Sequence, residues 1–134
     1  MYKKIIVSLA LDHGIGEQAL QTARQLRADD GKIFAVHVYE PLHGSVATYV
    51  DDEAVTAAVD GAKSRLNDRV AGMADVEPVL LKGHTGQALV DYAHKIDADC
   101  IIMGSHKPGL RDFLLGSTAA RVVRHAPCSV HVLR

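Results

Sequence analysis

The residues best placed to do chemistry lie in the C-terminal third of the chain. An apolar run stops at Gly104, and a short basic loop follows it. A second glycine, Gly116, precedes the hydroxyl residues Ser117 and Thr118 and an apolar pattern of helical spacing. Glycine lets backbone N–H groups approach an anion, and the first turn of a helix carries unpaired N–H donors. The layout is typical of a phosphate site, but it equally suits a strand that turns at Gly104 and a helix that Ser117 caps.

Length and composition restrict the class of protein. The chain has 134 residues, of which 48% are hydrophobic, so we expect one domain over residues 1–134. Lys and Arg total 15 against 16 Asp and Glu, which gives no overall charge for binding nucleic acid. The apolar runs are far shorter than the roughly 18 residues that span a membrane. Any anion site must therefore be local.

The N-terminus and the two cysteines indicate the compartment. The chain runs from Met1 straight into a strand pattern, without the apolar region of a signal peptide. Cys100 and Cys128 lie in apolar runs without zinc-ligand spacing, so we interpret them as reduced core thiols. A cytoplasmic location is the expectation.

Strand patterns alternate with helix patterns along the chain. The expected strands are Lys4–Leu9, Ile33–Tyr39, Val76–Leu81, Asp99–Met103 and Cys128–Leu133. The expected helices are Ala19–Leu26 closed by Gly31, Asp51–Met73, Thr85–Ile96 with Thr85 as a candidate cap, and Ser117–His125. This alternation predicts a doubly wound α/β fold: a mainly parallel five-stranded sheet with helices on both faces, in the Rossmann-like strand order 3-2-1-4-5.

The predicted topology brings separate segments to one edge of the sheet. Gly104 follows the fourth strand, Asp12 follows the first, and the second ends at Val38 to Glu40. Pro41 to Tyr49 is expected to be a loop over the same edge. Ligands of such sheets bind outside the carboxyl ends of the strands, where the strand order reverses.

With these segments placed, the whole chain resembles the universal stress protein (UspA) superfamily. The resemblance extends from Tyr2 to Val7, through His37-Val38 and the Lys82-Gly83 turn, to the stretch from Arg121 to Val130, which is its most specific part. It implies a universal stress protein domain over residues 1–134, a bound adenine nucleotide, and a homodimer formed through the C-terminal strand.

The family's phosphate motif matches only at its ends. In nucleotide-binding members it reads Gly, two residues, Gly, nine residues, then Gly-Ser or Gly-Thr. Gly104 matches the first glycine and Gly116-Ser117 the end, but Lys107 replaces the second glycine and the interval is one residue short. This Ser-His-Lys-Pro variant resembles a subgroup of short bacterial members that read Ser-His-Arg-Pro. Lys107 either supplies charge to a phosphate or is a solvated loop residue.

The first strand departs from the family as well. Ala10 stands where the family usually carries an aspartate, and Asp12 either takes over its contact with ribose or Mg²⁺ or caps the following helix. Val38 matches the position whose backbone meets the adenine. The resemblance thus implies a site for ATP, with Mg²⁺ as a candidate companion, at Ala10, Asp12, Val38, Met103, Gly104, Ser105, His106, Lys107, Gly109, Gly116, Ser117 and Thr118.

Other chemistries find little support in the residues. The eight histidines show no zinc spacing, and only His106, beside Gly104 and Lys107, is placed to meet a phosphate. Ser105 is not in a nucleophile elbow, so no catalytic residue is expected. Two functions remain: an ATP-binding regulatory protein of the stress response, in which slow hydrolysis or autophosphorylation is secondary, or a nucleotide-free dimeric interaction module.

Overall fold

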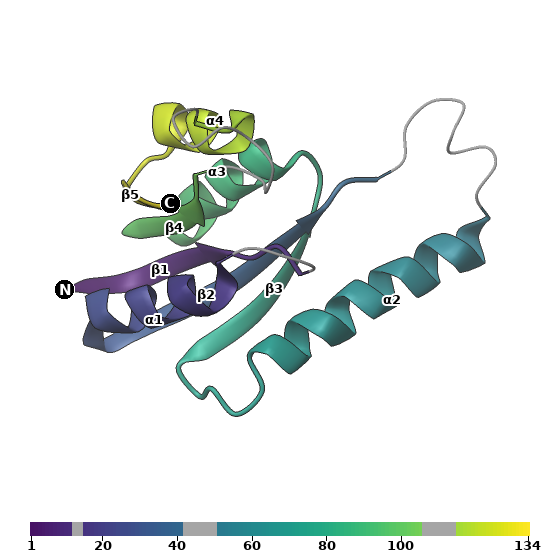
Figure 1. The fold of residues 1–134 in the computed structure, drawn as a ribbon, viewed down its shortest axis with the longest axis horizontal. Helices are drawn as coiled ribbons and strands as arrows, with labels where there is room; N and C mark the ends of the chain where they lie inside the picture. Colours follow the sequence, from purple (N-terminus) through teal and green to yellow (C-terminus); the bar gives the residue numbers. More distant parts are fainter. Residues whose placement is uncertain (12–14, 42–50, 106–114) are drawn as a thin grey trace.

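The computed structural model describes residues 1–11, 15–41, 51–105 and 115–134. Strands and helices alternate along these stretches (Figure 1). The strands are β1 (Tyr2–Ser8), β2 (Arg27–Tyr39), β3 (Val76–Lys82), β4 (Cys100–Gly104) and β5 (Ser129–Leu133). The helices are α1 (Gly16–Leu26), α2 (Asp52–Arg69), α3 (Thr85–Ile96) and α4 (Ser117–His125). None of the helices in the described stretches is long and apolar enough to cross a membrane.

The strands form one parallel sheet in the order β3-β2-β1-β4-β5. β1 is central because it pairs with β2 on one side, where Val7 faces Ala35, and with β4 on the other, where Val7 faces Ile102. The α/β fold class and the strand order expected from the sequence are both confirmed. The point where the strand order reverses lies between β1 and β4.

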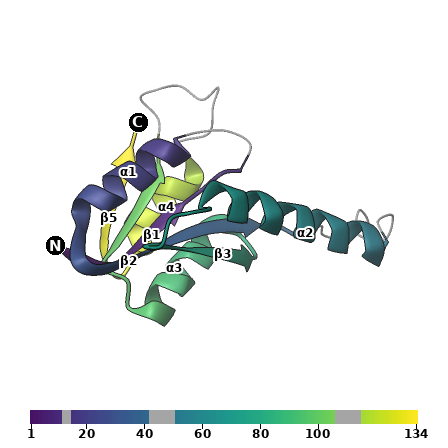
Figure 2. The same cartoon turned by 90° about the horizontal axis from the view of Figure 1, so that it is seen from below.

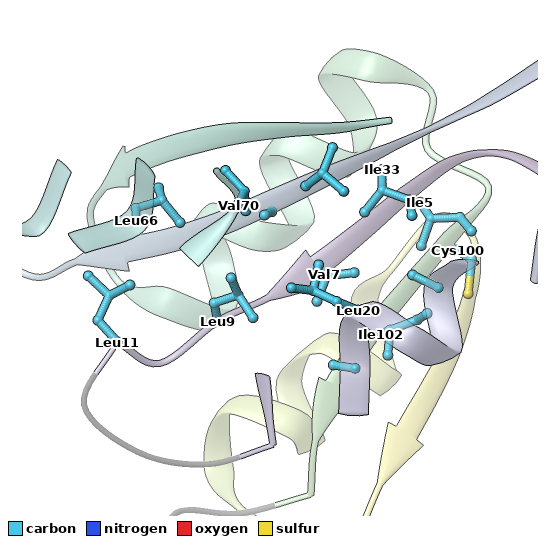
Figure 3. Packing of buried hydrophobic residues seen from close by; sticks show 14 of the residues in the cluster. Ile5, Val7, Leu9, Leu11, Leu20, Ile33, Leu66, Val70, Cys100 and Ile102 are labelled. Carbon is cyan, nitrogen blue, oxygen red and sulfur yellow. The ribbon is translucent and has the colours of Figure 1, made fainter. Parts of the chain in front are cut away.

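Alternating side chains of the buried strands fill two layers, one on each face of the sheet. Ile5 and Val7 of β1 pack with α1 and the C-terminal half of α2 (Figure 3). Ile6, between them in the sequence, packs on the opposite face with α3 and α4. Figure 2 shows α1 and α3 on opposite sides of the sheet. Burial on both faces explains why the strands are nearly continuous apolar runs.

The first helix ends earlier than the sequence indicated. It stops at Leu26, and residues 27–31 open β2 with an irregular register instead of continuing the helix to Gly31. The guanidinium of Arg27 donates from Nη1 to the carbonyls of Ala28, Asp29 and Gly31. A Cβ at Gly31 would lie 2.6 Å from the carbonyl oxygen of Tyr2. Glycine at this position therefore serves the close approach of β1, not a helix cap.

The second helix is shorter and less covered than expected. The Asp51 side chain caps it by accepting from the N–H of Ala54 at 2.7 Å, and it ends at Arg69 rather than Met73. Ala62, Leu66 and Val70 are buried, but Val55 is 44% exposed. The N-terminal half of α2 extends beyond the sheet (Figures 1 and 2). The apolar pattern there predicted packing against the sheet, and this half of the helix does not make that contact.

Polar contacts hold the amino-terminal edge of the sheet. The Asp99 carboxylate accepts from the backbone N–H groups of Lys3 and Lys4, at 2.9 Å each, and so ties the start of β1 to β4. Asp75, before β3, accepts a 2.9 Å hydrogen bond from Arg24 of α1 and lies 3.6 Å from Nε of Arg27. The hydrogen bond from Arg24, with the charges of both arginines, holds the pKa of Asp75 below its ordinary value.

The Asp75 cluster makes stability depend on pH. Because the folded-state pKa is depressed, its contribution is fully present above the unfolded pKa and is lost as pH falls through the folded one. We expect Asp75→Asn to lower the free energy of unfolding by about 1 kcal/mol at pH 7, since the Arg24 side chain is partly exposed and screened. Urea unfolding at a series of pH values from 7 downwards measures the difference, which should shrink as Asp75 becomes protonated.

A matched variant provides the control. Glu77→Gln removes an ion pair with Lys32 that is about half exposed on both sides, so its effect should be a few tenths of a kcal/mol at most. An Asp75→Asn protein that equals the unmodified chain at pH 7 would contradict a stabilising role for the cluster.

Candidate functional site

The turn after β1 and the end of β4 meet at the carboxyl edge of the sheet. A Cβ placed on Gly104 would lie 3.4 Å from Cδ1 of Ile15, the N-cap of α1. Ala10 and Leu11 continue from β1 on the other side of the same turn. A methyl at Gly104 would therefore just reach van der Waals contact with Ile15. The two turns, remote in sequence, lie side by side at this point.

Ser105 is the anchor of the connection from β4 to α4. Its side chain and backbone are 2% exposed. Its N–H donates to the carbonyl of Leu133 at 2.7 Å, and its own carbonyl accepts from the N–H of Gly116 at 2.7 Å. The backbone of Ser105 thus joins the residue before α4 to the final strand of the sheet. Ser105 cannot act as an exposed hydroxyl, but it fixes where α4 begins.

The first turn of α4 carries the N–H donors that the phosphate motif predicted. Gly116 is the N-cap, with φ −62° and ψ 158°, an extended conformation open to most residues. Its own N–H is bonded to Ser105, so the donors without a partner inside the helix are those of Ser117, Thr118 and Ala119. This first turn holds no acidic residue. The donors and the helix dipole together favour an anion at this end.

A close helix contact positions α4. A Cβ on Gly86 of α3 would lie 3.0 Å from Cδ of Arg121, and Arg121 donates from Nη1 to Oε1 of Gln87 at 2.8 Å. Ala119 and Val122 of α4 are buried in the layer shared with α3. The helix that presents the donors is therefore held by both packing and a hydrogen bond.

The end of β2 is tied to the start of α3. The Glu40 carboxylate accepts from both the N–H and the hydroxyl of Thr85, at 3.3 and 3.2 Å. Thr85 is the first helical residue and His84 the N-cap, so the predicted Thr85 cap was wrong by one position. The cap is a carboxylate from a neighbouring strand, and no local sequence pattern signals it.

The structure brings some of the predicted site residues together and leaves others apart. Ala10, Gly104, Ser105 and Gly116 lie around the meeting point of β1, β4 and α4. Val38 and Met103 are buried on the α3 and α4 side of the sheet, so only their backbone is available to a ligand. Asp12, His106, Lys107 and Gly109, with the rest of the Ser-His-Lys-Pro stretch, lie outside the described residues, as does most of the loop expected at Pro41 to Tyr49.

A shallow hollow borders this site without belonging to it. Its volume is about 380 Å³, and it is lined by Ile15, Glu17, Gln18 and Gln21 along α1. The Glu17 carboxylate disfavours an anion there. The hollow shares only Ile15 with the meeting point of the turns.

Nucleophilic and metal chemistry have little basis in the described residues. Burial raises the pKa of the Cys100 thiol to about 11 and also raises that of Cys128, so neither is a thiolate at neutral pH. Among the side chains that the structure describes, no three His, Cys, Asp or Glu residues gather as metal ligands would. The groups that the described residues place at this edge of the sheet are the backbone N–H donors at the start of α4.

Comparison with known proteins identifies the family. A model of the universal stress protein family matches residues 1–134. The chain belongs to the universal stress protein family. It is 31% identical over 144 residues to universal stress protein A homolog 2 of Coxiella burnetii (strain RSA 493 / Nine Mile phase I), covering 99% of this chain and 95% of the relative. It is also 31% identical to universal stress protein G of Salmonella typhimurium, with both chains covered in full.

Solved structures share the fold. Hypothetical protein MJ0577 superposes with a TM-score of 0.82 at 24% identity, covering 99% of this chain and 96% of that one. A universal stress protein in complex with cAMP aligns with a TM-score of 0.64 at 24% identity, over 99% and 97% of the two chains. The universal stress protein of Archaeoglobus fulgidus in complex with dAMP aligns at 0.60 and 24%, over 99% and 98%.

Glu40 offers a test of how the edge of the sheet is held. We expect Glu40→Ala to lower the free energy of unfolding by about 1 kcal/mol, because it removes the carboxylate that accepts from two donors at the start of α3. Thr85→Val should cost less, and the two losses should not add, since they break the same contact. Thermal unfolding of the single and double variants measures this. Fully additive losses would mean that the two residues act separately.

Proposed function

We propose that this protein is a cytoplasmic regulatory protein of the stress response that binds an adenine nucleotide, ATP in the first place. The observation that carries the proposal is the contact of the turn after β1 with Gly104, next to the N–H donors at the start of α4 that have no partner inside the helix. Both cysteines are free thiols, which suits a reducing compartment. The relatives whose structures contain cAMP and dAMP support an adenine nucleotide in this fold.

The proposed ligand extends along the carboxyl edge of the sheet. The N–H groups of Ser117 and Thr118, with their hydroxyls, receive the phosphates. The backbone of Val38, on the strand next to β1, meets the adenine. Ala10 lines the ribose between them. His106, Lys107 and Gly109 close the phosphate loop, and the charge of Lys107 replaces contacts that the missing second glycine gives in other members.

The place of Mg²⁺ in the proposal depends on Asp12. A magnesium ion needs oxygen ligands, and Ala10 offers none where the family usually carries an aspartate. Asp12 is the carboxylate nearest in sequence that could take this role. We therefore propose that ATP is the ligand. Mg²⁺ accompanies it only where the Asp12 carboxylate serves as a ligand to the ion.

Two departures favour the alternative, a nucleotide-free interaction module of the same family. Ala10 and Lys107 replace motif residues, and the N–H of Gly116 is already bonded to Ser105. The two proposals differ in one measurable property. The protein purified without added nucleotide and then denatured should release an adenine nucleotide, detected by mass spectrometry, or should bind ATP in calorimetry. A protein that releases no nucleotide and gives no heat with millimolar ATP would contradict nucleotide binding and support the interaction module.

Gly116 provides a variant for the phosphate end of the site. We expect Gly116→Val to weaken ATP binding at least tenfold, or about 1.4 kcal/mol, because the added side chain blocks the approach of phosphate to the donors of α4. The fold should survive, since the φ and ψ of Gly116 suit valine. Gly61→Val is the matched control, because no atom lies within 4 Å of a Cβ at that exposed position. Unchanged affinity in a Gly116→Val protein with native circular dichroism would remove this turn from the site.

We further propose that the protein is a homodimer through β5. Among the residues that the structure describes, this strand pairs only with β4, so no described strand covers its other edge. Val130 and Val132 are half-buried there, and pairing of two β5 strands across a two-fold axis would cover them.

Lysine substitution tests this interface. Replacing Val130 and Val132 together by lysine should shift the protein to a monomer, because like charges then lie opposite each other across the axis. Sedimentation at tens of micromolar measures the state. A monomer for the unmodified chain, or a dimer that survives both substitutions, would contradict pairing through β5.

A further inference from the structure

Arg69 connects the last turn of α2 to the turn after β1. It donates from Nη2 to the backbone carbonyl of Leu11 at 3.1 Å, across 58 positions of the chain. The apolar neighbours of Arg69 on α2, Leu66 and Val70, pack in the same cluster as Leu9 and Leu11 (Figure 3). The half-buried guanidinium therefore lies where α2 meets the carboxyl end of β1.

The same guanidinium also contacts the other end of this turn. A Cβ placed on Gly16, the first residue of α1, would lie 2.6 Å from Nη1 of Arg69 and 3.1 Å from Cδ2 of Leu9. Gly16 is buried, so its missing side chain leaves the space that the guanidinium fills. Leu11 and Gly16 flank the turn between β1 and α1. One planar group thus reaches both ends of the turn, which a lysine, with a single point of charge, could not do.

This turn forms one side of the candidate site. Ile15, next to Gly16, is the residue that Gly104 of β4 approaches, and Ala10 precedes Leu11. A shift of the turn would therefore move both the start of α1 and the first-strand side of the site relative to β4. We propose that Arg69 is a positioning residue for nucleotide binding: it clamps the two ends of the turn after β1 and so holds Ile15 against Gly104. The inference rests on the proposed function.

Two variants disturb the clamp in different ways. Arg69→Gln removes the guanidinium. Gly16→Ala leaves Arg69 in the chain but displaces its guanidinium, and the fold should persist because the clash is with the end of a flexible side chain. Alanine also favours a helix over glycine, which offsets part of the cost of displacing the guanidinium, and the thermal unfolding of this variant measures what remains. A purely structural role of Arg69 would predict no loss of affinity in a protein of full stability.

The experiment compares ATP affinity and thermal unfolding in the unmodified chain and the variants. We expect Arg69→Gln and Gly16→Ala each to weaken ATP binding by about five- to tenfold, with Arg69→Lys intermediate. In the Arg69→Gln background, Gly16→Ala should cause no further loss, because the group that it displaces is gone. Arg65→Gln, on an exposed position of the same helix, is the control and should bind ATP normally.

Hydrogen exchange of the nucleotide-free protein separates the two proposals. The amide of Ala19, which donates to the carbonyl of Ile15 at 2.8 Å, should exchange faster in Arg69→Gln than in Arg65→Gln, whether or not ATP binds. An unmodified protein that does not bind ATP overturns the proposed function. An unmodified protein that binds ATP, with Arg69→Gln at the same affinity, overturns the role of Arg69. Equal exchange rates in the two arginine variants overturn the clamp itself.

Discussion

The parallel pairing of β1 with both β2 and β4 is the constraint on which the rest of the structure depends. Parallel neighbours end at the same edge of a sheet, so this pairing alone brings the segments after Ser8, Tyr39 and Gly104 together. It requires β1 to be buried on both faces, which the apolar Ile5, Ile6 and Val7 permit. Because the core holds the central strand in place, a few polar contacts suffice to position the turns that follow it. The site at this edge consists of such contacts.

Each turn at the carboxyl edge is held by a group from elsewhere in the chain. Glu40 holds the start of α3, the carbonyl of Leu133 holds Ser105, and Arg69 reaches both ends of the turn after β1. The contact of Gly86 with Arg121 then fixes α4 against α3. These contacts connect the site to the edge strand β5, to α3 and to α2. Displacement of any one of these elements is therefore expected to alter the geometry that a nucleotide meets.

The sequence predicted the fold well because its signals for fold are periodic and redundant. Apolar runs such as Cys100 to Met103 and the helical spacing in α1, α3 and α4 each point to the same architecture. The sequence predicted the ends of helices and strands less well where a contact with a residue far away in the chain determines them. Gly31 looked like a helix stop, but the carbonyl of Tyr2 lies where its side chain would be. The apolar pattern of α2 likewise continues beyond the sheet that would cover it. The core fixes which elements form, whereas single contacts fix where they end.

The candidate site could be predicted in part for the same reason. Gly104, Gly116 and Ser117 stand out because small residues and hydroxyls interrupt apolar patterns. Arg69 and Glu40 do not stand out, since a charged residue at a helix end or after a strand is ordinary, and only the tertiary structure shows what each one touches. The structure also gives Gly116 a different role from the phosphate donor that its sequence position indicated. Its N–H serves the bond to Ser105, so the donors for an anion are one to three positions further along.

The central claim is that the carboxyl ends of β1, β2 and β4 and the start of α4 form one adenine-nucleotide site. Titration of the ¹⁵N-labelled protein with ATP, followed by two-dimensional NMR, tests it most directly. The account predicts saturable shifts of the amides of Leu11, Val38, Gly104, Ser105 and Ser117, with Asp75 and Asp99 at the opposite edge unmoved. Shifts confined to other surfaces, or an unchanged spectrum at millimolar ATP, would contradict it.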